Sequence, residues 1–115
     1  MLFALGDTRP DGLLTVERTY FEHTEPNVYD DPGTYVATDV EFEHNLYHEW
    51  NHGLGEIVTA LLDHGMEVTT FVEHDSVPWD ALPGQMEQTV LGEWRLVDRP
   101  GRLPCSYTLG AVKRR

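Results

Sequence analysis

The sequence contains very little cysteine and few basic residues. Cys105 is the only cysteine among 115 residues, which excludes an internal disulfide. Lysine and arginine together number 8 against 20 aspartate and glutamate residues, so the formal net charge is -12. Such an excess of negative charge disfavours binding to nucleic acid and to anionic membrane surfaces. We therefore expect neither as a partner.

Long apolar segments are also missing. No stretch approaches the roughly 18 apolar residues that a membrane span needs. The segment from Met1 to Leu5 is too short for the apolar region of a signal peptide and has no basic start. These features predict a cytoplasmic protein. With 115 residues, including three Trp, five Tyr and four Phe, the chain is expected to fold as one domain.

The pattern of apolar residues predicts strands with a single helix. Residues 2–5 form an apolar run typical of a strand buried on both faces. Residues 11–39 are rich in turn signals and short strand pieces, and residues 40–50 alternate with the period of a strand. The most distinct helical stripe lies at residues 53–64, just before a glycine.

Two further strands are expected after the helix. They cover residues 67–74 and 103–112, and a short strand or turn is expected at residues 94–97. Residues 76–92 are expected to be irregular. Because this connection has a poor helical pattern, we predict that the two long strands pair antiparallel.

The segment from His48 to His52 matches the H-E-x-x-H motif of zinc peptidases. That motif binds zinc only when one helix places both histidines on the same face. Here the preceding residues alternate as in a strand, whereas Gly53 and Gly55 follow, and Asn51 is a good helix N-cap. We therefore expect the motif to straddle a strand end and a helix start, with no metal bound. A small zinc metallopeptidase and a non-catalytic interaction remnant remain as alternatives.

A longer linear pattern runs through most of the chain. It comprises Asp31-Pro32-Gly33-Thr34-Tyr35, Trp50-Asn51-His52, Leu54 to Met66, Val72-Glu73-His74, Pro78-Trp79, Leu103-Pro104, Ser106 to Leu109 and Ala111-Val112-Lys113. This pattern resembles the C-terminal half of class I S-adenosylmethionine-dependent methyltransferases of the small bacterial type. The resemblance implies an α/β fold, the C-terminal portion of a doubly wound Rossmann-like sheet with an antiparallel last strand.

The resemblance also implies how the chain is divided. In that arrangement one partial domain spans residues 1–115. Residues 1–10 form a central strand and turn, residues 11–50 a β-rich insert or cap over the substrate pocket, and residues 51–115 the helix and final strands. A glycine-rich cofactor loop and its acidic partner are missing from the sequence. The implied function is therefore one part of a methyltransferase for a small-molecule acceptor. S-adenosylmethionine would bind only the complete enzyme, assembled with a missing N-terminal half or by self-association.

Two sets of residues are candidates for the site. Catalysis needs a proton acceptor, which imidazole or a carboxylate at the carboxyl end of a strand can provide. The candidates of this type are His48, His52, Glu73 and His74. Substrate binding favours aromatic side chains and an acidic residue that ends a strand. The candidates of this type are Asp7, Tyr35, Tyr47, Trp50 and Trp79.

Overall fold

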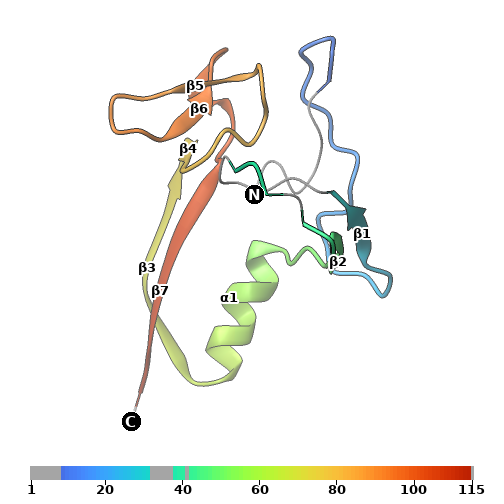
Figure 1. Cartoon of the computed structure of the whole chain (residues 1–115). Helices are drawn as coiled ribbons and strands as arrows, with labels where there is room; N and C mark the ends of the chain where they lie inside the picture. The colour runs from blue at the N-terminus through green and yellow to red at the C-terminus, as the bar shows by residue number, and fades with distance from the viewer. Residues whose placement is uncertain (1–8, 32–37, 41, 115) are drawn as a thin grey trace.

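The structure is a computed structural model that describes residues 9–31, 38–40 and 42–114. These residues form one α-helix, one 3-10 helix and seven strands (Figure 1). In chain order the elements are β1 (Asn27–Asp30), β2 (Leu46–Glu49), α1 (Leu54–Asp63), β3 (Met66–His74), β4 (Ser76–Val77), β5 (Met86–Gln88), β6 (Trp94–Leu96), the 3-10 helix (Pro100–Arg102) and β7 (Ser106–Lys113).

The strands form three small antiparallel sheets, so the predicted doubly wound α/β fold is wrong. The sheets have the strand orders β1-β2, β3-β7 and β4-β6-β5. A parallel pair requires a crossover, usually through a helix. Within the described residues α1 is the only α-helix, and it joins β2 and β3, which belong to different sheets. The strand predicted at residues 2–5 lies outside the described residues.

The helix and the two long strands agree with the sequence predictions. The helix α1 differs from the predicted segment by one residue at each end. Gly65 follows it with a φ of 71°, a conformation that glycine adopts without steric cost. The strands β3 and β7 pair antiparallel from Met66 opposite Lys113 to His74 opposite Ser106. The predicted antiparallel pairing is therefore confirmed.

The buried core is small and lies around the three-stranded sheet. It consists of Val77, Leu82, Met86, Leu96 and Cys105. The prediction that residues 76–92 are irregular is wrong in part, because this segment supplies β4, β5 and three of these core residues. The two strands are only two and three residues long. These short strands form because each pairs with β6, and the residue pattern within so short a segment does not reveal such a pairing.

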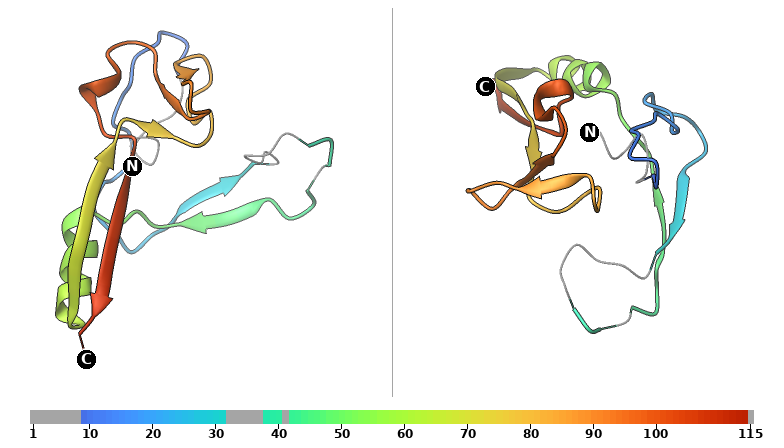
Figure 2. Two further views of the ribbon diagram at one scale, coloured as in Figure 1. Left: turned by 90° about the vertical axis from the view of Figure 1, so that its left-hand side faces the viewer. Right: turned by 90° about the horizontal axis from the view of Figure 1, so that it is seen from above.

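The described part of the chain is extended, and much of its apolar surface is uncovered. The radius of gyration is 16.4 Å, whereas a compact chain of this length would have about 13 Å. The helix α1 has no buried residue, and the β1-β2 hairpin projects away from the unit formed by α1, β3 and β7 (Figure 2). Exposed large apolar residues include Val16, Phe21, Leu46, Leu62, Phe71, Val72, Val90, Leu91 and Val112. Among the described residues, no helix has the length and apolar character needed to cross a membrane.

Candidate functional site

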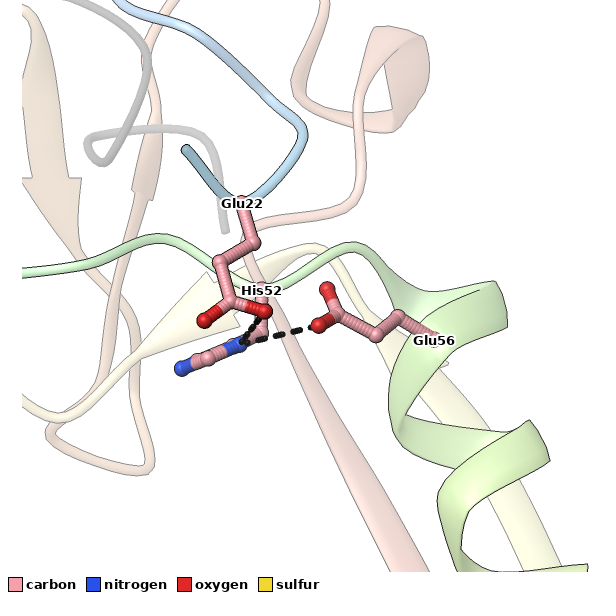
Figure 3. A group of neighbouring side chains, drawn as sticks. All are labelled: Glu22, His52 and Glu56. Carbon is pink, nitrogen blue, oxygen red and sulfur yellow. Dashed lines mark hydrogen bonds and ion pairs between the residues drawn. The ribbon is translucent and has the colours of Figure 1, made fainter. Parts of the chain in front are cut away.

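Three side chains from two distant segments meet beside the start of α1 (Figure 3). Glu22 precedes β1, His52 lies between β2 and α1, and Glu56 lies in the first turn of α1. The Nδ1 atom of His52 is 3.4 Å from Oε1 of Glu56 and 3.7 Å from Oε2 of Glu22. All three side chains are accessible to solvent.

Hydrogen bonds at the start of α1 hold these segments together. The side chain of Asn51 donates a hydrogen bond to the backbone carbonyl of Tyr20. Gly53 is the N-cap residue and is buried under the Tyr20 ring, where an added Cβ would lie 3.2 Å from Cε1. The prediction that Asn51 caps the helix is therefore wrong, since its amide binds a distant carbonyl instead. This contact positions Glu22, two residues after Tyr20, next to the helix.

The two carboxyl groups of the cluster shift each other's pKa in opposite directions. Their mutual hydrogen bond raises the pKa of Glu22. The same hydrogen bond lowers the pKa of Glu56, and a hydrogen bond with His52 contributes to this decrease. Two neighbouring carboxylates repel when both are charged, so the pair retains one proton more firmly than two isolated glutamates would. The cluster is therefore suited to hold positive charge.

An open apolar groove extends from this cluster along α1. Its volume is about 490 Å³, and it is lined by His52, Glu56, Ile57, Ala60, Leu61 and His64. The helical residues recur at intervals of three or four, which places them on one face of α1. Nδ1 of His64 lies 2.8 Å from the carbonyl oxygen of Ala60. A groove with apolar walls and polar groups at both ends suits a small, mostly apolar ligand.

The predicted site residues Tyr47 and His48 lie on β2, and Trp50 follows that strand directly. Tyr47 stacks on Tyr29 with ring centroids 5.2 Å apart. His48 lies opposite Val28 in the pair, and Trp50 donates a 3.4 Å hydrogen bond to a loop carbonyl. None of these three residues lines the groove along α1, whereas the predicted residue His52 does.

The H-E-x-x-H motif starts on a strand, as predicted, but ends in the connection before the helix and does not reach the helix itself. The strand β2 ends at Glu49, and α1 begins at Leu54. His48 is therefore on a strand, whereas His52 is in the connection that precedes the helix. The two histidines do not share a helical face, which is the arrangement that a zinc peptidase of this type requires.

The remaining predicted residues lie elsewhere or outside the described part. Glu73 and His74 end β3, where Nε2 of His74 is 2.9 Å from Oγ1 of Thr108 on β7. Trp79 packs against the buried core. Asp7 and Tyr35 lie outside the described residues. The structure thus distributes the predicted site residues over the hairpin, the β3-β7 pair and the core.

Three polar residues of the cluster and groove, Glu22, Glu56 and His64, were not predicted as site residues from the sequence. The spacing of Glu56 and His64, both four residues from Ala60, is a signal that could have revealed the shared helix face. Glu22 has no comparable signal, because its approach to His52 depends on the path of the intervening chain. No family model matches the chain, and no curated protein or solved structure is significantly similar to it.

Proposed function

We propose that this chain contributes the acceptor-binding part of an S-adenosylmethionine-dependent methyltransferase that acts on a small molecule. The observation that supports the proposal is the order of α1, β3 and β7, with β3 and β7 antiparallel. The methyltransferase resemblance implies this order and pairing. The proposal concerns function alone, since the described residues form no doubly wound sheet.

The described residues do not fit the cofactor. The helix α1 begins after Gly53, whose backbone is covered by Tyr20 and is not open to a ligand. No acidic residue after a parallel strand is present among these residues, because every pair is antiparallel. A cofactor of this type is held by backbone N–H groups of a glycine-rich turn and by such an acidic residue. In our proposal another segment or polypeptide supplies them.

The groove along α1 is the part of this chain that would bind the methyl acceptor. Ile57 and Leu61 offer apolar contact, and His52 at one end can accept a proton from the acceptor. The uncovered apolar surface and the large radius of gyration support a second polypeptide, or a second copy, as partner. We also propose a cytoplasmic location, which agrees with a single cysteine that cannot form an internal disulfide.

The test compares two proteins. One is this chain alone, and the other is the joined protein, a longer polypeptide in which the in-frame DNA sequence upstream of Met1 is translated together with this chain. Calorimetry with S-adenosylmethionine should detect no binding to the chain alone, because most hydrogen bonds to the cofactor would be missing. The joined protein should bind it and transfer a labelled methyl group to a member of a panel of small phenols, amines and carboxylic acids.

Variants of the joined protein connect activity to the groove. Leu61→Asp places a charge in the groove and should abolish transfer, whereas Leu91→Asp, at a residue that is 88% exposed and outside the groove, should leave it unchanged. Micromolar cofactor binding by this chain alone would overturn the proposed division of the site. Failure of the joined protein to methylate any acceptor in the panel would overturn the proposed function.

A further inference from the structure

We propose that Glu22, His52 and Glu56 form a binding site for one divalent transition-metal ion. This inference goes beyond the methyltransferase proposal and does not rest on it. It also departs from the sequence-based expectation that no metal is bound. One ligand atom from each residue lies within 4.8 Å of the others, and Figure 3 shows the two carboxylates and the imidazole directed toward one another.

The distances within the cluster suit a small metal ion. The two distances from Nδ1 of His52 to the carboxylate oxygens are 3.4 and 3.7 Å. Nitrogen and oxygen ligands of tetrahedral zinc lie about 2.0–2.1 Å from the ion, which places neighbouring ligands about 3.3 Å apart. The two distances from His52 therefore need only a slight contraction for all three side chains to reach one ion.

The chemistry of the ligands selects the class of metal. One imidazole nitrogen and two carboxylate oxygens suit Zn²⁺ or Mn²⁺, whereas a soft ion such as Cu(I) prefers sulfur. The two carboxylates carry two negative charges and the neutral imidazole carries none, so one divalent cation neutralises the cluster. The net charge of -12 on the whole chain further favours a cation.

The fold positions the ligands before any ion binds. Glu22 belongs to the segment before β1, and Glu56 belongs to α1, so these residues are far apart in the sequence. The hydrogen bonds from Asn51 and Leu54 to Tyr20 hold the two segments together. Ion binding therefore has to order the three exposed side chains but does not have to bring the two backbone segments together. An ion would fasten the N-terminal segment to the start of α1.

Three protein ligands leave at least one coordination position free. His52 and Glu56 also line the groove, so this position can be reached from the groove and from solvent. Catalytic zinc sites also have three protein ligands and one exchangeable position, although their ligands include more histidine or cysteine than this cluster does. The site differs from the H-E-x-x-H pattern, because it uses His52 but not His48.

The experiment is a calorimetric titration of the metal-free chain with ZnCl₂ and, separately, MnCl₂ near neutral pH. We expect saturable binding of one ion per chain. Glu22→Gln, His52→Gln and Glu56→Gln should each weaken binding at least about tenfold. The matched controls Glu25→Gln, from the same loop as Glu22, and His48→Gln should bind like the original protein.

Circular dichroism shows whether each variant folds. If a variant does not fold, a second measurement on the unmodified protein tests the site instead. In the unmodified protein, imidazole nitrogen NMR signals report which histidine binds the metal. One equivalent of zinc should shift the His52 signal and leave the signals of His48 and His64 in place. The proposal is overturned if millimolar metal gives no saturable binding, if Glu22→Gln binds normally, or if another histidine shifts instead of His52.

Discussion

The hydroxyl oxygen of Tyr20 accepts a hydrogen bond of 2.8 Å from the backbone N–H of Leu54, the first residue of α1. The N-cap Gly53 has no side chain that could accept this bond. The first N–H groups of a helix have no partner within the helix, and a side-chain oxygen commonly satisfies one of them. Tyr20 therefore replaces the cap from a distant part of the sequence and connects the N-terminal segment to the helix.

Removing this hydroxyl should destabilise the protein. We expect Tyr20→Phe to lower the free energy of unfolding by about 1 kcal/mol, because the Leu54 N–H loses its partner while the ring remains. Urea unfolding followed by circular dichroism measures the change. Tyr107→Phe is the control: its ring contacts Phe71, and its hydroxyl makes no hydrogen bond with the described residues. Equal effects of the two substitutions would contradict the capping role.

Gly55 inside α1 and Gly65 just after it should respond to alanine in opposite directions. Gly65 has a φ of 71°, so Gly65→Ala should destabilise the protein by about 1 kcal/mol. Gly55 lies inside the helix, and an added Cβ would meet no atom within 4 Å. Gly55→Ala should therefore stabilise the protein by about 0.5 kcal/mol through its higher helix propensity. Thermal unfolding of both variants checks the signs, and a loss of stability in Gly55→Ala would disprove the helical assignment.

The small core should be sensitive to loss of volume. Leu96 is fully buried, and Leu96→Ala should cost about 2–5 kcal/mol, because it removes apolar contacts and leaves a cavity. The control Val90→Ala changes a residue that is fully exposed, and its effect should stay within about 0.5 kcal/mol. Chemical denaturation with a tryptophan fluorescence signal is a suitable measurement, since Trp79 and Trp94 pack against this core. Similar midpoints for the two variants would show that the core lies elsewhere.

The thiol of Cys105 should react slowly with alkylating reagents. Burial, and to a smaller extent the charge of Asp75, raises the pKa of this thiol, so little thiolate forms near pH 8. The associated stability is fully present below the unfolded thiol's pKa of about 8.5 and is lost as pH rises through the higher folded pKa. Iodoacetamide labelling followed by mass spectrometry tests this, with the protein in denaturant as the fast control. Equal rates with and without denaturant would argue against a buried thiol.

The sequence by itself determined those helices and strands that form because of the pattern of residues adjacent in the chain. The helical stripe and Gly65 predicted α1, and alternation predicted β3 and β7. Their antiparallel pairing followed from the poor helical pattern of the connection. The sequence also predicted that the H-E-x-x-H motif begins at a strand end and does not lie on one helix, because glycine and alternation act locally, although the helix starts two residues after the motif.

The tertiary structure decided which of these elements meet. The doubly wound sheet was wrong because the described strands pair only within three small antiparallel sheets. The pairing of Leu54 with Tyr20 and the approach of Glu22 to His52 likewise depend on how the intervening chain returns to the helix. Periodicity is a property of adjacent residues, whereas these contacts follow from the lowest free energy of the whole chain. For that reason the sequence alone predicted His52 but not the two carboxylates beside it.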